Sequence, residues 1–212
     1  MPVLPGAERE LNAVRRLIGG SAGDELLGAA FTRRATVSRP LSDYRVLHFA
    51  SHALLQSDIA CLDEPAIVTT VAPNDPTPAL LTATDILVNM KLSADVVVLS
   101  ACNTGGGSGR DGGESLSGLA KSFFFAGARA LMVTHWSVDD YTNVRLVVEA
   151  LDGMNESPTG ALSPALRKAQ MRMMATPGYE HPFFWAPMIV LGEGGGRPPA
   201  AGSASSVRSA GL

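Results

Sequence analysis

One cysteine and one histidine are placed in the sequence where a nucleophile and its base could be built. Cys102 follows a continuous apolar run, 96–99, and precedes a glycine-rich stretch, and His52 follows another run, 44–50. A thiol becomes a nucleophilic thiolate near neutral pH only beside a base or a positive charge. About 50 residues separate the two, as in one known family of cysteine peptidases. Most free cysteines simply pack in the core, so the histidine is what makes Cys102 a candidate.

The surrounding elements must bring these two residues together. The apolar runs 44–50, 96–99 and 128–133 are typical of strands that are buried on both faces, as in a parallel sheet. Between the last two runs, 114–126 has the apolar spacing of a helix. Because parallel strands carry their reactive loops at the carboxyl edge, the histidine and the cysteine should share a crevice there. We expect an α/β fold with a mostly parallel sheet and helices on both faces.

Other segments complete the expected order of elements. Thr82 and Asp85 predict a capping box at the start of a helix that ends near Met90. Ser137 and Asp140 predict the same device before a second helix. The remaining expectations are a helix over 7–19, a hairpin around the turn 73–78, the helix 141–151, a helix from Ser163 that includes Met173, and a final strand over 183–191.

Composition excludes several classes of protein. The formal net charge is −3, so a general affinity for nucleic acid is not expected. No apolar stretch reaches the roughly 18 residues of a membrane span, and no secretory signal is recognisable at the start. We therefore expect a cytoplasmic protein in which Cys61 and Cys102 are free thiols. The stretch 193–212 is rich in Gly, Ala, Ser and Pro and is expected to be a disordered tail.

Four motifs, taken in order, resemble the CHAT domain. They are Leu-His-Phe-Ala-Ser-His at 47–52, Leu-Ser-Ala-Cys-Asn-Thr at 99–104, the stretch 127–140 with Thr-His-Trp-Ser, and His-Pro-Phe-Phe-Trp-Ala at 181–186. This caspase- and separase-related family of peptidase-like domains is often fused to tetratricopeptide repeats. The resemblance covers about 4–192, so we expect one domain, 1–192, with a three-layer caspase-like sandwich. It implies His52 as the catalytic histidine and Cys102 as the nucleophile, with Ala53 where the family usually has glycine.

Further residues are candidates for the same site. Asn103 and Ser51 are expected to form the loops around the pair, with backbone amides near Asn103 serving as an oxyanion hole. The candidates for the substrate pocket are Ser100, Asp111, Glu114, Trp136 and Asp139. The acidic members suggest selectivity for Arg or Lys before the scissile bond. The same carboxylates also suit solvated loops and helix N-termini, and Trp136 also suits ordinary packing.

The resemblance predicts a cysteine endopeptidase that cleaves a protein substrate without a cofactor. A tetratricopeptide-repeat region or another regulatory protein is the expected partner. The competing hypothesis is a non-catalytic interaction or regulatory module that keeps a peptidase-like fold, which the alanine at position 53 would allow.

Two other hypotheses use residues of the same region. The stretch 107–112 satisfies G-x-G-x-x-G, the pattern of a dinucleotide-binding turn, but its last glycine lies far from the strand end. His48, His52 and Cys61 could ligate zinc, although their spacing matches no common zinc pattern. His48 lies within an expected strand and is more simply interpreted as a packed or hydrogen-bonded residue.

Overall fold

A five-stranded sheet forms the centre of the molecule. The computed structural model describes residues 6–55, 58, 62–72, 78–100, 112–136, 139–194, 196 and 209–211. The strands lie in the order β7-β6-β5-β1-β8, with bounds Met188–Gly192, Ala130–Thr134, Val96–Leu99, Val46–Phe49 and Ser209–Gly211. Only the β6–β7 pair is antiparallel, so the expectation of an α/β fold with a mostly parallel sheet is confirmed.

The register of the central strands fixes which ends are neighbours. Phe49, the last residue of β1, lies opposite Leu99, the last residue of β5. Leu99 in turn lies opposite Val133 of β6. The carboxyl ends of β1, β5 and β6 therefore meet at one edge of the sheet.

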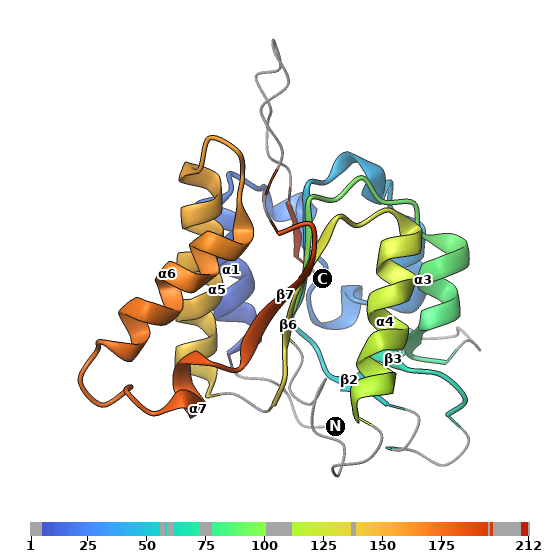
Figure 1. The fold of residues 1–212 in the computed structure, drawn as a ribbon. Helices are drawn as coiled ribbons and strands as arrows, with labels where there is room; N and C mark the ends of the chain where they lie inside the picture. Colours follow the sequence, from blue (N-terminus) through green and yellow to red (C-terminus); the bar gives the residue numbers. More distant parts are fainter. Residues whose placement is uncertain are drawn as a thin grey trace.

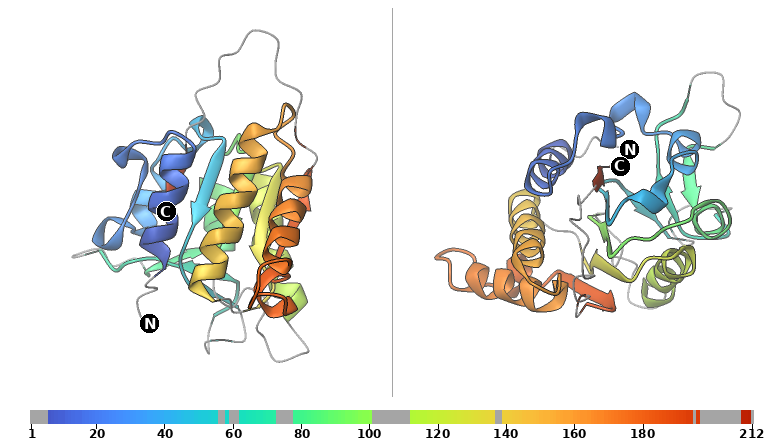
Figure 2. Two further views of the ribbon diagram at one scale, coloured as in Figure 1. Left: turned by 90° about the vertical axis from the view of Figure 1, so that its left-hand side faces the viewer. Right: turned by 90° about the horizontal axis from the view of Figure 1, so that it is seen from above.

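Helices lie on both sides of this sheet (Figure 1; Figure 2, right). One side carries α1 (Ala7–Leu17), α5 (Asp140–Glu156) and α6 (Leu162–Met174), and the other carries α3 (Ala83–Asn89) and α4 (Gly112–Ala126). Successive strand residues alternate between two separate apolar cores. Leu47, Phe49, Val97 and Leu99 pack with α3 and α4, whereas Val46, Val96 and Val98 pack with the other helices.

A small antiparallel sheet lies beside the main one. It contains β2 (Ala53–Leu54), β3 (Ala66–Val68) and β4 (Leu80–Thr82) in that order. The pairing of β3 with β4 confirms the expected hairpin. Thr82 then caps α3: its hydroxyl accepts from the Asp85 amide at 3.1 Å, and Asp85 accepts in return from the Thr82 amide at 3.2 Å. The predicted capping box is therefore confirmed.

Two expectations about the second half of the chain are wrong. The segment expected as the start of the last strand forms a short helix, α7 (Pro182–Trp185), and β7 begins only at Met188. Pro182 suits the first turn of a helix, where its missing amide hydrogen is not needed, and His181 Nδ1 accepts from the Phe183 amide at 3.1 Å.

Helix α5 is capped by Asp139, and Asp140 is its first residue, whereas Ser137 of the expected capping box lies outside the described residues. It begins one residue earlier than expected and extends five residues beyond Leu151, to Glu156. The extension follows the apolar face, since Leu151 and Met154 are both buried.

The stretch expected to be a disordered tail contains a strand that the sequence did not indicate. Ser209–Gly211 forms β8, which pairs in parallel with Val46, Leu47 and His48 of β1. The division of the chain into a domain at 1–192 and a tail stays a prediction.

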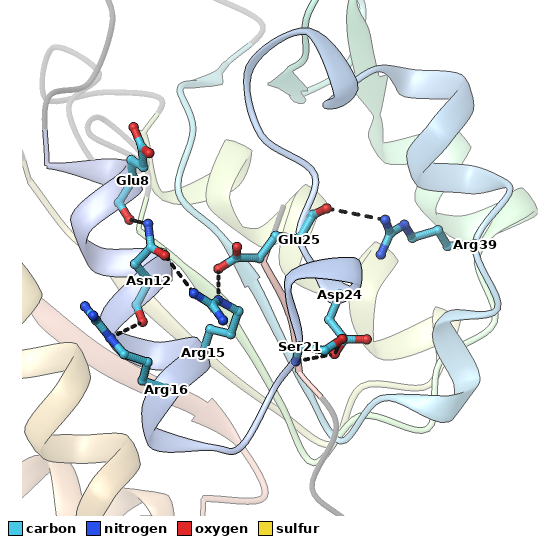
Figure 3. A network of polar contacts seen from close by, with 8 residues as sticks. All are labelled: Glu8, Asn12, Arg15, Arg16, Ser21, Asp24, Glu25 and Arg39. Atoms are coloured by element: carbon cyan, nitrogen blue, oxygen red, sulfur yellow. Dashed lines mark hydrogen bonds and ion pairs between the residues drawn. The ribbon is translucent and has the colours of Figure 1, made fainter.

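The first third of the chain contains short helical elements after α1. It holds the short helical turns η1 (Ala22–Asp24), η2 (Gly28–Ala30) and η3 (Leu41–Asp43) and the helix α2 (Arg33–Val37). Polar contacts attach α1 to this region on its outer side (Figure 3). Arg15 Nε donates to Glu25 Oε1 at 2.8 Å, and the Glu25 carbonyl accepts from Arg39.

The amino edge of the main sheet is closed by ion pairs. Asp95, just before β5, pairs with Arg45 before β1 and with Arg129 before β6, the latter at 3.1 Å. Arg129 also pairs with Glu193, just after β7, at 2.8 Å. These contacts connect four neighbouring strands at the edge opposite the candidate site.

Candidate functional site

His52 lies in the short connection between the main sheet and the small sheet. It follows β1 by three residues and immediately precedes β2. The Val68 amide donates to the His52 carbonyl at 2.8 Å, and the Ser51 hydroxyl donates to the Val68 carbonyl at 2.6 Å. The connection is therefore held at two points by β3, and His52 is partly exposed beside the carboxyl edge.

The neighbouring strand delivers the second candidate to the same edge. The Ser100 amide, directly after β5, donates to the Phe49 carbonyl at the end of β1 at 3.0 Å. Cys102 follows two residues later, but 101–111 lies outside the described residues, and so does Cys61. The roles predicted for Cys102, Asn103 and Asp111, and the glycine-rich turn of 107–112, stay predictions.

A buried polar network lies directly behind this edge. His48 Nε2 lies 2.6 Å from Glu10 Oε1 of α1 and 3.2 Å from Ser100 Oγ. Glu10 Oε2 accepts from Asn143 Nδ2 of α5 at 2.9 Å. The exposed fractions of these residues are 1% for His48, 3% for Glu10, 5% for Asn143 and 7% for Ser100. Helix α1, strand β1, the end of β5 and helix α5 thus contribute one residue each to a cluster that is shielded from water.

The geometry excludes a catalytic relay within this network. Glu10 and Ser100 both approach the same ring nitrogen of His48, whereas a relay needs one partner on each nitrogen. Ser100 was a candidate for the substrate pocket, but its hydroxyl is buried against His48. The network can therefore orient backbone and side chains behind the edge.

Sequence reasoning interpreted His48 correctly as a hydrogen-bonded strand residue but missed Glu10 and Asn143. A signal for Glu10 was present. It lies four residues before Val14 and one before Leu11, so a carboxylate occupies the apolar face of α1. A buried carboxylate at such a position requires partners, and here they are His48 and Asn143.

The remaining pocket candidates lie along the same edge. Trp136, just after β6, is partly buried, and its indole Nε1 donates to the Phe183 carbonyl at 3.4 Å. Asp139 is exposed and accepts from the Thr142 amide at 3.1 Å as the cap of α5. Glu114 lies in the first turn of α4. The roles of these three residues in a substrate pocket stay predictions.

Ala53, where a glycine was expected from the resemblance, is a regular strand residue. It pairs with Ile67 and belongs to the apolar core shared with α3 and α4. Its methyl group is buried, with 3% of the residue exposed. The methyl group of this alanine is therefore accommodated inside the protein.

Two further observations bear on other kinds of site. Among the residues that the structure describes, no group of three or more His, Cys, Asp or Glu gathers as metal ligands would. Within the same part of the chain, no helix is both long and apolar enough to cross a bilayer.

The sequence matches the family model of the CHAT domain over residues 1–193. The chain therefore belongs to the CHAT family, a family of caspase-like peptidases. A search of curated proteins found no match.

Proposed function

We propose that this chain is a cysteine endopeptidase in which His52 and Cys102 form the catalytic dyad. The observation that carries the proposal is the junction of β1 and β5, where Phe49 and Leu99 pair and the Ser100 amide bonds to the Phe49 carbonyl. His52 lies three residues beyond Phe49, and Cys102 lies three residues beyond Leu99. Membership of a caspase-like peptidase family supports the same assignment. It also supports our proposal that the layers are arranged as a caspase-like sandwich.

The reaction follows from the chemistry of the two side chains. His52 takes the thiol proton, and the sulfur of Cys102 attacks the carbonyl carbon of the scissile peptide bond. Backbone amides near Asn103 stabilise the oxyanion that forms. The C–N bond breaks as His52 returns the proton to the leaving amine, which leaves a thioester. Water, deprotonated by His52, then attacks the thioester and releases the new carboxylate and the thiol.

The substrate pocket is proposed at the same edge, with Ser51 in the loop beside it. Trp136 offers an aromatic wall, and Asp111, Glu114 and Asp139 offer negative charge for a basic residue before the cleaved bond. Asp139 keeps a solvent-exposed carboxylate while it caps α5, which is compatible with this role. We propose that a tetratricopeptide-repeat region or a separate regulatory protein controls the activity.

The first experiment measures the reactivity of each thiol. In a Cys61→Ala background, the alkylation rate of Cys102 by iodoacetamide is followed from pH 5 to pH 9, roughly spanning the range below and above a free thiol's pKa of about 8.5. Cys102 should react at pH values where an ordinary thiol is inert, and His52→Ala should remove that reactivity. His135→Ala, which changes an exposed histidine after β6, is the matched control and should leave it intact.

The competing function, a non-catalytic regulatory module, makes the opposite prediction. Cys102 would then react like a free thiol in every variant, and His52→Ala would change nothing. The methyl group of Ala53 is buried in the apolar core, and this weakens one reason for preferring the alternative. With a substrate in hand, cleavage that survives Cys102→Ala would contradict the proposed mechanism.

A further inference from the structure

The buried network of Glu10, His48, Ser100 and Asn143 has no role in the proposed reaction, yet it lies directly beneath the two strand ends that carry it. We propose that Glu10 and His48 are positioning residues, which fix the carboxyl ends of β1 and β5 relative to each other from helix α1. The inference rests on the proposed function, because the dyad at those strand ends is what the network would position.

Burying the polar side chains of this network costs desolvation free energy. His48 and Glu10 are each less than 5% exposed, and their side chains interrupt an apolar core formed by Val46, Val98 and Leu146. Replacing a buried ion pair by apolar residues of similar volume is often neutral or stabilising. Stability alone therefore does not account for a carboxylate and an imidazole at these positions.

The contacts explain what the pair can do instead. His48 is the penultimate residue of β1, which ends at Phe49, and His52 follows three residues after that end. The His48 ring nitrogen also reaches Ser100, the first residue after β5. A single imidazole thus touches both strand ends, and Glu10 holds that imidazole from α1 at 2.6 Å.

Helix α1 is itself fixed from both sides. Its inner side reaches α5 through the bond between Glu10 and Asn143, and its outer side is attached to the η1 region through Arg15 and Glu25 (Figure 3). A helix that contributes no residue to the carboxyl edge is therefore connected to it through one buried contact. Misplacement of catalytic groups by about 1 Å can cost on the order of 100-fold in rate, so small shifts of the strand ends matter.

The structure also supplies a variant that preserves the network. Glu10→Gln keeps the size of the side chain and can keep an oxygen beside His48 Nε2. The amide that this variant introduces would face the Asn143 amide, but Asn143 Oδ1 has no hydrogen-bond partner among the described residues. A flip of the Asn143 amide would therefore turn that oxygen toward the introduced amide. Glu10→Leu, by contrast, keeps the volume but removes the oxygen that lies 2.6 Å from His48 Nε2.

The test measures how strongly His52 raises the reactivity of Cys102. In the full chain with Cys61→Ala, the alkylation rate of Cys102 is divided by the rate after His52→Ala, and this ratio measures the contribution of His52. We expect a ratio of at least about tenfold in the unmodified network. It should fall about fivefold or more in Glu10→Leu and about threefold in Ser100→Ala, and stay within about twofold in Glu10→Gln. The control Glu25→Gln loosens the outer attachment of α1 and should also stay within about twofold.

Each outcome decides one question. All rates are measured at a temperature where thermal melts show every variant to be folded, and Ser100→Ala carries the test if Glu10→Leu does not fold. An unchanged ratio in Glu10→Leu or Ser100→Ala would overturn the positioning role while leaving the dyad intact. So would an equal fall in Glu10→Gln and Glu10→Leu, because that pattern indicates general damage. A ratio near one without any network substitution would overturn the dyad itself, and the positioning role with it.

A spectroscopic measurement tests the network independently of Cys102. In protein labelled with nitrogen-15 at histidine, the hydrogen on His48 Nε2 should be protected from solvent exchange because it is buried between Glu10 and Ser100. The signal should persist in Glu10→Gln and be lost or strongly shifted in Glu10→Leu. A rapidly exchanging Nε2 hydrogen in the unmodified chain would overturn the proposal.

Discussion

The two faces of the main sheet are built from the same strands but differ in chemistry. Toward α3 and α4, the strand residues are uniformly apolar, and Phe49 packs on Phe123 with ring centroids 5.5 Å apart. Toward α1 and α5, apolar residues give way to His48 and Ser100 at the carboxyl end. Alternation along β1 and β5 separates the two faces residue by residue.

The difference indicates a division of tasks between the faces. A uniformly apolar layer gains free energy from burial and tolerates many volume-conserving exchanges. A buried carboxylate and imidazole add little net stability but demand one particular geometry. We therefore expect substitutions toward α3 and α4 to change mainly stability, and those toward α1 and α5 to change the reactivity at the sheet edge as well.

The largest stability effect is expected on the apolar face. Phe123→Ala removes a side chain that is fully buried against Phe49 and should lower the free energy of unfolding by about 4 kcal/mol. Denaturant unfolding measures the change. Phe125→Ala, on the same helix but with the residue 79% exposed, is the control and should stay within about 0.5 kcal/mol. Equal losses in both variants would contradict the placement of this core.

The polar face should show coupling between its buried polar side chains. Glu10→Leu removes the carboxylate beside His48 and the acceptor of Asn143, and it should cost about 3 kcal/mol. Adding His48→Leu removes one of those unpaired groups, so the double variant should be more stable than the sum of the single effects by about 2 kcal/mol. A double-mutant cycle by denaturant unfolding gives the coupling energy, and simple additivity would mean that the two side chains do not interact.

The turn between α4 and β6 lies beside the apolar face and depends on a close backbone contact. Gly127 has a φ of +116°, and an added Cβ would lie 2.2 Å from the Leu92 carbonyl oxygen. Gly127→Ala should therefore destabilise the protein by about 3 kcal/mol, since both strain and a clash with backbone arise. Gly19, with a φ of +71° and open space around it, is the matched position, and its alanine variant should cost only about 1 kcal/mol. Denaturant unfolding of both variants measures the difference, and equal costs would contradict the close approach of Leu92.

The smallest expected effect is a pH dependence of stability that arises from Asp85 in the first turn of α3. Burial alone raises the pKa of Asp85, but hydrogen bonds from Arg33 and from the Thr82 amide outweigh it and hold the pKa below its usual value. The resulting stability is present above the unfolded pKa of about 3.9 and is lost as the pH falls through the lower folded value. Asp85→Asn should thus be less stable than the parent at pH 7, and the gap should close in acid. Denaturant unfolding of the parent and the variant at pH 7 and in acid measures the difference in stability. A difference that stays constant with pH would contradict the role of the Asp85 charge.

Local patterns predicted the central architecture well. The runs that became β1, β5 and β6 are continuously apolar, and the capping box at Thr82 is encoded by the residues themselves. The cap of α5 was harder, because Ser137, Asp139 and Asp140 are all good caps and the path of the chain after β6 selects among them. The strand over 209–211 has no sequence signal of its own, since it depends on the open side of β1.

Local patterns likewise predicted some features of the candidate site and not others. The positions of His52 and Ser100 after strands followed from the apolar runs, because strand ends set where the next residues emerge. The contact between Glu10 and His48 joins residues from two separate elements, and no local pattern specifies which helix packs on which strand. The carboxylate on the apolar face of α1 indicated that a partner exists, although not which one.

The two bonds that join the His52 connection to β3 make one amide a natural reporter of the site. The Val68 N–H is engaged only while the His52 carbonyl stays in place, at 2.8 Å. Its hydrogen can exchange with deuterium from solvent only when that connection opens. The exchange rate of a single backbone hydrogen therefore measures how often the segment carrying the candidate base leaves its position, without any label or substrate at the sheet edge itself.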